Sequence, residues 1–409
     1  MTSVDLTAVD IFDPDLYVDR PPHELFEHLR RTEPVYWQEW GDGTGCWAIL
    51  KHADVVHVAR EPVLFSASAG GVVVEDLAPE RLEMMRNMLL AMDPPRHVDH
   101  RRPLAPSFGK KVIGGLEPRI REICREILAR AGELGDVEFV DDVTSLLPSQ
   151  VVGELMGLPS GDWPKIQAWA DEITSGPEHD APAAEDGVDG YDPDDPSVQM
   201  AMYAIEFGAR RRGEPAREDL TSLILGADFG HGPMTDVDFG SFFVQLVTAG
   251  NDTTKAMLAS GLLALLTHPD QMDELRGDPT LVPGAVEEIL RWANPLHYFR
   301  RTATADTVVR DVPIRAGQKV AMVYTSANRD EEVFDDPHRF DIRRDPNPHL
   351  SFGIAEHFCL GAHLARLEGR VFFEELLSTF PTIELTGEPV RTRSNLTNKL
   401  KTLPVRLGR

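Results

Sequence analysis

The chain has 409 residues, of which 42% are hydrophobic and 26% charged, as in a globular protein with a substantial core. Its formal net charge of −26 argues against a nucleic-acid partner, because phosphate binding requires a basic surface. The longest apolar stretch, residues 256–266, is too short to span a bilayer, and the first five residues lack the features of a secretion signal. We therefore expect one domain, residues 1–409, in a cytoplasmic monomer with no membrane span.

The three cysteines are too few for a disulfide framework and fit a reducing compartment. Cys46 opens an apolar strand, and Cys124 lies on the apolar stripe of an amphipathic helix, so both are expected in the core. Cys359, near the C-terminus, has a different setting.

Short strands flank a glycine-rich segment near the N-terminus. The apolar segments 35–37 and 46–50 enclose Gly-Asp-Gly-Thr-Gly at 41–45, which predicts a β-hairpin. A phosphate-binding loop would need a capped helix directly after the glycines, and none follows.

The middle of the chain is predicted to be mainly helical. Helical periodicity dominates residues 118–158, returns at 163–173 and resumes at 197–212. Between the last two segments, Pro177 to Pro196 is rich in Asp, Glu, Pro, Gly and Ala, which predicts an acidic loop between two helices.

The longest predicted helix begins after an N-cap at Thr235 and ends near residue 268, a length of roughly 50 Å at 1.5 Å per residue. Polar residues interrupt its apolar middle at 249–254, Ala-Gly-Asn-Asp-Thr-Thr. One explanation is a helix kink, in which Thr253 bonds back to the Ala249 carbonyl and Asp252 pairs with Lys255. The other explanation is a functional site inside the helix.

Cys359 lies in a glycine-bounded loop, FGIAEHFCLG at 352–361, directly before a predicted helix that starts near Ala362. A helix N-terminus favours a thiolate, and a thiolate can ligate a metal. Two other interpretations exist. Free cysteines often serve as small buried apolar residues. Zinc would use nearby histidines, although structural zinc sites usually combine two close-spaced ligand pairs and no second pair occurs.

The pattern Phe-Gly-x-x-x-His-x-Cys-x-Gly resembles the heme-binding loop of the cytochromes P-450, and residues 249–254 resemble the oxygen-activation motif of that family. Further motifs in the same order extend the resemblance over nearly the whole chain, and it looks closest to the actinobacterial branch that oxidises steroids and branched lipids. The resemblance implies a mainly α fold with small β-sheets. It would form a triangular helical prism, with the heme between the long central helix and the helix after the cysteine loop.

The resemblance also implies roles for individual residues. Cys359 would be the proximal ligand of the iron of heme b, and Asp252 and Thr253 would be catalytic residues that deliver protons during dioxygen activation, Asp252 by swinging between buried and solvated partners. The other residues expected to bind the cofactor are Ala249, Gly250, Phe352 and Gly361, with His97, Arg101, Arg301 and His357 at the heme propionates. Glu288, Arg291 and Arg339 are expected to form a structural network that supports the cysteine loop.

The activity implied is oxygen-dependent hydroxylation of a hydrophobic small molecule, such as a steroid, terpenoid or branched lipid. A peroxide-using heme enzyme and a noncatalytic heme-binding ligand sensor are the alternatives. The residues expected to line the substrate pocket are Val72, Val73, Met88, Leu89, Leu246, Val247, Leu296, His297, Tyr298, Phe299, Leu396 and Thr397. His297 and Tyr298 replace small apolar residues common at these positions in steroid-side-chain oxidisers, which indicates a polar anchor in the ligand.

Electrons must come from another protein, because the chain has no flavin or iron–sulfur binding pattern. The resemblance implies a ferredoxin with an NAD(P)H-dependent ferredoxin reductase. A local basic patch on an acidic protein would steer an acidic partner. The residues expected to form this patch are Arg101, Arg102, Lys110, Lys111 and Arg366.

Overall fold

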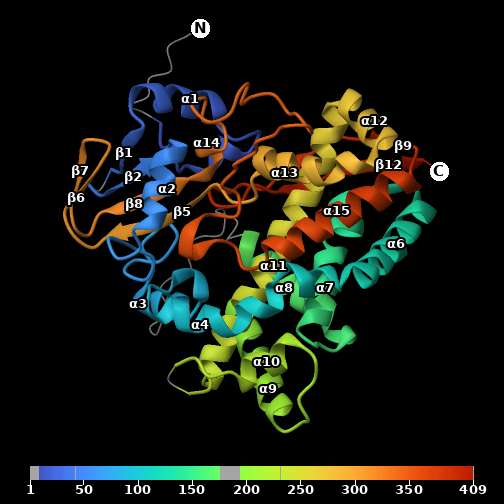
Figure 1. Ribbon diagram of the computed structural model, residues 1–409, viewed down its shortest axis with the longest axis horizontal. Helices are drawn as coiled ribbons and strands as arrows, with labels where there is room; N and C mark the ends of the chain where they lie inside the picture. Colours follow the sequence, from blue (N-terminus) through green and yellow to red (C-terminus); the bar gives the residue numbers. More distant parts are fainter. Residues whose placement is uncertain (1–8, 42, 176–193, 231, 409) are drawn as a thin grey trace.

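The computed structural model describes residues 9–41, 43–175, 194–230 and 232–408. Helices make up the larger part of the molecule, and a β-sheet with a few covering helices forms the smaller part at the left of the view (Figure 1). The long helix α11 (Asp236–Thr267) passes through the helical part, and α15 (Ala362–Thr379) lies close to it (Figure 1).

Helix α11 begins with a reciprocal cap. The Thr235 hydroxyl accepts a hydrogen bond from the Asp238 amide, and the Asp238 side chain accepts one from the Thr235 amide. This arrangement satisfies two amides that the first helical turn leaves unpaired. The predicted start and length of the helix are confirmed. The helix packs against α7 (Leu146–Leu155), α8 (Trp163–Ser175), α9 (Pro196–Arg212), α13 (Val282–Ala293) and α15.

The remaining helices lie outside this central group or connect it to the sheet. They are α1 (His23–Thr32), α2 (His52–Arg60), α3 (Pro79–Arg86), α4 (Arg96–Leu104), α5 (Lys110–Gly114), α6 (Glu117–Leu134), α10 (Leu220–Gly226), α12 (Pro269–Gly277) and α14 (Tyr324–Ala327). Helix α6 packs against both α7 and α15 through its apolar stripe, which contains the buried Cys124.

The largest sheet has the strand order β1-β2-β8-β5-β3. Its strands are β1 (Val35–Glu39), β2 (Gly45–Ile49), β3 (Phe65–Ser66), β5 (Tyr298–Ala303) and β8 (Lys319–Val323). Strands β1 and β2 form the predicted antiparallel hairpin, and the buried Cys46 lies in β2. Strand β8 pairs with β2 in parallel and with β5 in antiparallel orientation, so residues near 300 and 320 join the N-terminal hairpin.

Three smaller sheets hold the other strands. They are β4 (Asp136–Glu138) with β12 (Pro404–Gly408) and β9 (Thr382–Leu385), β6 (Thr307–Val309) with β7 (Val312–Ile314), and β10 (Val390–Arg391) with β11 (Leu400–Thr402). The helical pattern predicted across 118–158 is therefore wrong at β4. Gly135 ends α6 with φ 75°, and Val137 then pairs with Val405 of β12, a partner too distant in sequence for a local pattern to reveal.

The predicted acidic loop, Pro177 to Pro196, lies outside the described residues except for its last three positions. Asp195 caps α9 by accepting a hydrogen bond from the Ser197 amide at 2.8 Å, so the helix predicted at 197–212 is confirmed. Among the described helices, none has the length and apolar character needed to cross a membrane.

Candidate active site

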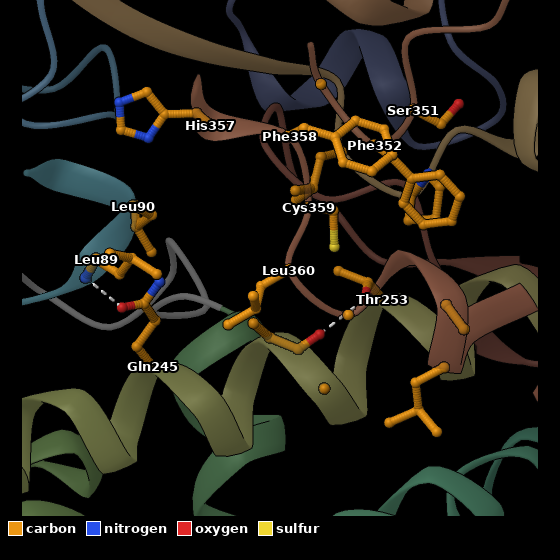
Figure 2. Close-up of a pocket in the computed structure, with 18 of the residues that line it drawn as sticks. Leu89, Leu90, Gln245, Thr253, Ser351, Phe352, His357, Phe358, Cys359 and Leu360 are labelled. Atoms are coloured by element: carbon orange, nitrogen blue, oxygen red, sulfur yellow. Dashed lines mark hydrogen bonds between the residues drawn. The ribbon is translucent and has the colours of Figure 1, made fainter. Parts of the chain in front are cut away.

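A cavity separates α11 from the cysteine loop. On one side lie Ala249, Gly250 and Thr253 of α11, and on the other lie residues 351–361. Figure 2 shows Cys359 Sγ pointing from the loop towards α11, with Thr253 facing the same space. The structure therefore brings together the two motifs predicted to act on opposite sides of one cofactor.

The cysteine loop is held by its backbone. The Cys359 amide donates to the Phe352 carbonyl at 2.8 Å, and Gly353 turns the chain with φ 65°, a conformation that glycine adopts without strain. Gly361 is the N-cap residue of α15. Burial raises the pKa of the Cys359 thiol, whereas a hydrogen bond from the Gly361 amide and the charges of two nearby arginines act in the opposite direction.

Arg366 ties the loop to the helices behind it. Its guanidinium lies over the Phe352 ring at 4.5 Å from the centroid and donates two hydrogen bonds to the Glu287 carboxylate, at 2.7 and 2.8 Å. His349 approaches the same carboxylate at 3.2 Å. Phe352 therefore has a fixed position at the cavity wall.

Four basic side chains converge at one end of the cavity. His97 and Arg101 come from α4, Arg301 from β5, and His357 from the short 3₁₀ turn Ala355–His357. The rings of His97 and His357 lie 4.4 Å apart. Burial lowers the pKa of His97 to about 4 and that of His357 to about 2, with the charges of Arg101 and Arg301 acting in the same direction. Both imidazoles are therefore neutral near pH 7.

No described carboxylate accepts a hydrogen bond from this cluster, and Arg101 donates to the Phe358 carbonyl at 2.6 Å. Both ring nitrogens of His97 and the Nε2 of His357 are buried and have no hydrogen-bond partner among the described residues. Arg301 is 4% exposed, and its only hydrogen bond to a described residue goes to the Arg300 carbonyl at 2.8 Å. Among the described residues, neither Arg101 nor Arg301 forms a salt bridge. Buried donors without acceptors fit an anionic ligand, and the carboxylates of a heme would supply the acceptors that the protein lacks.

Strand alternation explains which neighbours face the cavity. Phe299 and Arg301 of β5 line it, whereas Tyr298 and Arg300 point to the opposite face of the strand. Arg300 donates to the carbonyls of Val73 and Glu75 at 3.3 and 3.2 Å. Of the two adjacent arginines, only Arg301 lines the cavity.

The polar segment of α11 divides between two sides of the helix. Thr253 lines the cavity and donates to the Ala249 carbonyl at 2.8 Å. Asp252 is 3% exposed and faces away, with its carboxylate 3.0 Å from Lys399 Nζ and 3.4 Å from Lys255 Nζ. Both contacts expected of a simple helix kink are present. Only Thr253 of this pair reaches the cavity directly.

Gly250 has a packing role as well. A Cβ atom at this position would lie 2.7 Å from Cγ2 of Val152 on α7. Any larger residue would therefore displace α7 from α11, which are two walls of the same cavity.

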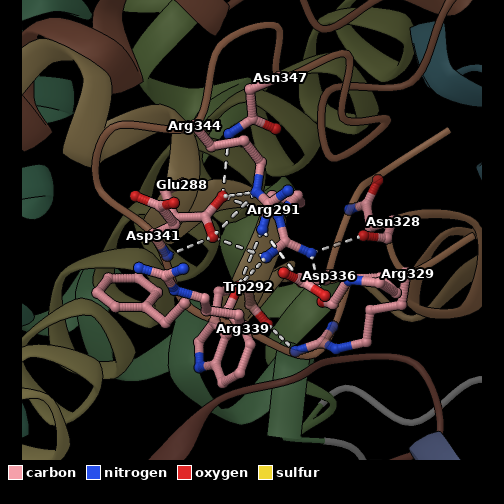
Figure 3. Close-up of polar contacts among 12 residues, drawn as sticks. Glu288, Arg291, Trp292, Asn328, Arg329, Asp336, Arg339, Asp341, Arg344 and Asn347 are labelled. Atoms are coloured by element: carbon pink, nitrogen blue, oxygen red, sulfur yellow. Dashed lines mark hydrogen bonds and ion pairs between the residues drawn. The ribbon is translucent and has the colours of Figure 1, made fainter. Parts of the chain in front are cut away.

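The predicted structural network exists, with one correction (Figure 3). Arg291 donates to both oxygens of Glu288, at 2.7 and 2.8 Å, and to the Arg339 carbonyl at 3.0 Å. The expected side-chain role of Arg339 is wrong, because that side chain is exposed and only its carbonyl takes part. The turn after it instead brings Arg344 within 3.2 Å of Glu288.

Four of the residues predicted to line the substrate pocket do so. Leu246 and Leu296 lie on α11 and in the segment before β5, and Leu89 and Phe299 complete the set. The spacing of Leu246, Ala249, Gly250 and Thr253 is that of one helical face, which explains why Val247 is buried in the core instead. The predicted residues that do not line this cavity are Val72, Val73, Met88, Val247, His297, Tyr298, Leu396 and Thr397.

His297 and Tyr298 do not form a polar anchor for the ligand. The His297 ring packs 4.4 Å from the Tyr17 ring and shares a hydrogen bond of 2.8 Å with the Thr325 hydroxyl. The Tyr298 hydroxyl accepts a hydrogen bond from the Val74 amide at 3.2 Å. Both side chains belong to the packing between β5 and the N-terminal segments, because β5 presents Phe299 to the cavity.

Several lining residues were missed by sequence reasoning. Gln245, one turn before Ala249, accepts a hydrogen bond from the Leu89 amide at 2.5 Å (Figure 2). Glu368 on α15 is 1% exposed, its Oε2 has no partner, and burial raises its pKa to about 8. The sequence contained a signal for each of these two residues. Gln245 lies one helical turn before Ala249, and Glu368 interrupts the apolar stripe of α15. The other missed residues include Leu90, Leu155, Met156, Leu220, Met257 and Tyr324.

Known proteins share this sequence and fold. The cytochrome P450 family model matches residues 199–406. A steroid C26-monooxygenase of Mycolicibacterium smegmatis is 36% identical over 402 residues, which cover 96% of this chain and 92% of the relative. A methyl-branched lipid omega-hydroxylase of Mycobacterium bovis is 36% identical over 391 residues, which cover 93% and 90%. A solved structure of a Mycobacterium marinum cytochrome P450 in complex with pseudoionone has a TM-score of 0.85 at 35% identity, covering 94% of each chain.

These relatives confirm the resemblance to the actinobacterial branch, and the structural match confirms the expected fold. The unsatisfied donors beside Cys359 fit the cofactor that this family carries. Because its sequence and fold match these enzymes over nearly their whole length, the chain belongs to the cytochrome P450 family and is a monooxygenase with heme b as its cofactor.

Proposed function

We propose that this enzyme hydroxylates a hydrophobic small molecule of the steroid, terpenoid or branched-lipid class. The observation that carries the proposal is the cavity wall beyond the cysteine loop, which is almost entirely apolar. The names of the two relatives, a steroid C26-monooxygenase and a methyl-branched lipid omega-hydroxylase, support the same class. The residues on this part of the wall are Leu89, Leu90, Val152, Leu155, Met156, Leu246, Leu296 and Phe299.

When bound, heme b supplies the iron at which dioxygen is activated for insertion into a C–H bond. In the proposed arrangement the thiolate of Cys359 would hold the heme iron. His97, Arg101, Arg301 and His357 hold the carboxylates, since these four side chains meet at one end of the cavity. Phe352 and Gly361 shape the loop around the sulfur, and Ala249 and Gly250 let α11 come close on the other side.

Thr253 and Asp252 are proposed to deliver protons in succession. The Thr253 hydroxyl lies at the cavity surface, where it can orient water while it donates to the Ala249 carbonyl. Asp252 lies one residue away, on the far side of the helix, and is held by Lys399 and Lys255. To pass a proton towards the cavity, its carboxylate has to exchange a lysine contact for a water molecule.

We propose a ferredoxin as the electron donor and the cytoplasm as the location. Lys110 and Lys111 are exposed on α5, which packs against α15, the helix after the cysteine loop. Arg102 is exposed nearby on α4 and pairs with Asp99 at 3.5 Å. Arg366 belongs to the expected patch only in part, because Glu287 already neutralises it. The docking surface is therefore proposed to centre on Lys110 and Lys111, with Arg102 as a partly neutralised member.

A ligand screen and a turnover assay test the proposal together. Binding of a substrate of this class displaces water from the cavity, and we expect a shift of the Soret band from low to high spin with a steroid, terpenoid or branched fatty acid. With a ferredoxin, its reductase and NAD(P)H, the same compound should yield a hydroxylated product. No spectral response from any compound of these classes would contradict the substrate class. Turnover with peroxide alone would identify a peroxide-using enzyme instead.

A further inference from the structure

A second cavity lies apart from the first, and no residue lines both. It is bounded by α1, the C-terminal half of α11, the end of α13 and the region of β10, it opens to solvent at Arg20 and Glu24, and its volume is about 480 Å³. Small-molecule sites commonly have volumes of about 300–1,000 Å³. The size of the cavity is therefore sufficient for a small organic ligand.

A buried arginine without a counter-charge faces this cavity. Arg329 is 2% exposed, and it donates to the Trp292 carbonyl at 2.9 Å while its guanidinium lies 4.7 Å from the Trp292 ring centroid (Figure 3). Its Nε and Nη1 are buried without a partner, and it forms no salt bridge with any described residue. Burying an unpaired cation is unfavourable unless an anion accompanies it.

The carboxylate whose charge acts on this arginine is already used by other partners. Glu288 accepts hydrogen bonds from Arg291 and Arg344, as Figure 3 shows, so it does not neutralise Arg329. Burial and the positive charges of Arg291 and Arg391 lower the pKa of Arg329. The Glu288 charge acts in the opposite direction but does not compensate for them, and an anion in the cavity would add to its effect.

Other donors face the same cavity. Arg391 donates to Asn398 Oδ1 at 2.9 Å and to the Asp19 carbonyl at 3.2 Å, and it forms no salt bridge with a described residue. The Ser260 hydroxyl and the Nδ1 of His23 are buried and without partners. These groups come from α1, α11 and β10, so they surround the space on several sides.

The two acidic residues of this cavity are already paired. Glu24 forms a salt bridge with Arg20 at 2.7 Å, and Glu27 forms one with Arg31 at 2.6 Å. His338 also approaches Glu27 at 3.2 Å. Neither carboxylate has a salt bridge to Arg329 or Arg391. The two inner arginines therefore remain available to a ligand.

Part of the wall is apolar, and this restricts the kind of anion. A fully hydrated inorganic ion gains nothing from such a surface, whereas an organic acid buries its hydrocarbon part there. The apolar residues of the wall are Pro21, Leu263, Ala264, Trp292 and Ala293.

We propose that the second cavity binds the carboxylate of a small amphiphilic acid, with Arg329 and Arg391 as its charged partners. The hydrocarbon part would lie against Leu263 and Trp292, and the Ser260 hydroxyl would donate a further hydrogen bond. This site lies behind α11 and does not contact the heme cavity, so the proposal is independent of the substrate class argued above.

Isothermal titration of the holoenzyme with octanoate tests the proposal. The heme cavity is first saturated with 4-phenylimidazole, so that remaining binding occurs elsewhere, and an unchanged Soret spectrum during the titration verifies this. We expect saturable binding of octanoate and no binding of octan-1-ol, which has a similar hydrocarbon chain but no charge. Arg391→Gln and Arg329→Gln should each weaken octanoate binding about tenfold or more, because each removes a charge-assisted hydrogen bond.

The matched control is Arg130→Gln, which removes an exposed arginine of α6 outside this cavity and should leave the affinity unchanged. Arg391→Gln keeps the test valid if Arg329→Gln fails to fold, since Arg329 also supports the Trp292 carbonyl. The proposal is overturned if octanoate does not bind, if octan-1-ol binds equally well, or if folded Arg391→Gln binds octanoate as tightly as the control.

Discussion

Two clusters of basic side chains in this enzyme differ in how their polar groups are satisfied. Around Glu288, the carboxylate accepts hydrogen bonds from Arg291, Arg344, the Asp341 amide and Asn347. Around the heme cavity, His97, Arg101, Arg301 and His357 gather without any carboxylate. The first cluster is complete within the protein, whereas the second is complete only when a ligand supplies its acceptors. The distinction separates residues that stabilise the fold from residues that we propose to bind the cofactor.

Removing a partner from the complete cluster should have the largest effect. In Arg291→Met, the buried Glu288 loses its two shortest hydrogen bonds. Breaking a buried pair in this way costs about 3–5 kcal/mol. We expect a loss of that size in the free energy of unfolding of the holoenzyme, measured by urea denaturation. Arg20→Met, which breaks an exposed pair with Glu24, is the control and should cost less than about 1 kcal/mol. Equal losses in the two variants would contradict the structural role of the network.

The incomplete cluster should respond in the opposite way. Arg301→Gln removes a buried, uncompensated charge, so the apoprotein should be as stable as wild type or more so. Heme affinity should fall about tenfold to a hundredfold, because a charge-assisted hydrogen bond to a carboxylate is lost. The rate of heme transfer to a scavenger protein measures the affinity, and circular dichroism of the apoprotein measures stability.

Arg300→Gln is the matched control for this variant. Arg300 is the adjacent residue on the opposite face of β5 and bonds to the carbonyls of Val73 and Glu75. Its replacement should destabilise the protein and leave the rate of heme transfer unchanged. If Arg301→Gln instead destabilised the apoprotein and retained heme, Arg301 would belong with the structural cluster.

Glu368 is an acid whose buried carboxyl oxygen lacks a described hydrogen-bond partner, whereas the unsatisfied groups discussed so far are basic. Because this carboxyl group titrates, the stability of the protein should depend on pH. Its pKa is raised to about 8 by burial, well above the value of 4.5 for an ordinary glutamic acid. The stability that this group contributes is therefore fully present below pH 4.5 and is lost as the pH rises through 8. Glu368→Gln has no such titration. Between pH 5 and pH 8, we expect wild type to lose about 3.5 kcal/mol relative to this variant, close to the limiting slope of about 1.4 kcal/mol per pH unit.

Urea unfolding of both proteins across this pH range measures the difference. Glu384→Gln, at an exposed position of β9, should parallel wild type over the same range. A constant difference between wild type and Glu368→Gln would show that the carboxyl group is solvated or has a partner.

Sequence patterns correctly predicted the structural features that are determined by residues adjacent in the chain. The cap at Thr235 and the glycine-bounded cysteine loop are local, and both occur in the structure as expected. The positions of His297 and Tyr298 were predicted wrongly, because the pairing of β5 with β8 decides which strand face meets the cavity. Sequence order likewise could not show that Arg344, rather than Arg339, reaches Glu288.

The second cavity was invisible in the sequence for the same reason. Arg329 and Arg391 lie far apart along the chain, and in the sequence each resembles an ordinary surface arginine. Only the folded structure shows that both line the same cavity. Whether a buried charge has a partner is a property of tertiary contacts. It was therefore the structure that separated satisfied from unsatisfied groups.

Thr253 is the exception to the comparison, because it has a hydrogen-bond partner and yet lines the active-site cavity. Thr253→Ala should change the free energy of unfolding by less than about 1 kcal/mol, since its bond to the Ala249 carbonyl is local to the helix. The ratio of product formed to NAD(P)H consumed should nevertheless fall severalfold, because the substitution removes the hydroxyl that orients water at the cavity surface. Thr253→Ser, which restores the hydroxyl, should recover most of the ratio.

Thr248→Ala is the matched control for Thr253→Ala, the variant with the smallest expected change in the free energy of unfolding. Thr248 makes the same kind of bond, to the Val244 carbonyl at 2.7 Å, on the same helix, but it does not line the cavity. The two alanine variants should therefore lose similar stability and differ only in coupling. If Thr248→Ala reduced the ratio as much as Thr253→Ala, the effect would come from bending of α11. If neither variant reduced the ratio of product to NAD(P)H, Thr253 would have a structural role only. The rule that hydrogen-bonded groups stabilise the fold and unsatisfied groups bind ligands would then hold at Thr253 as well.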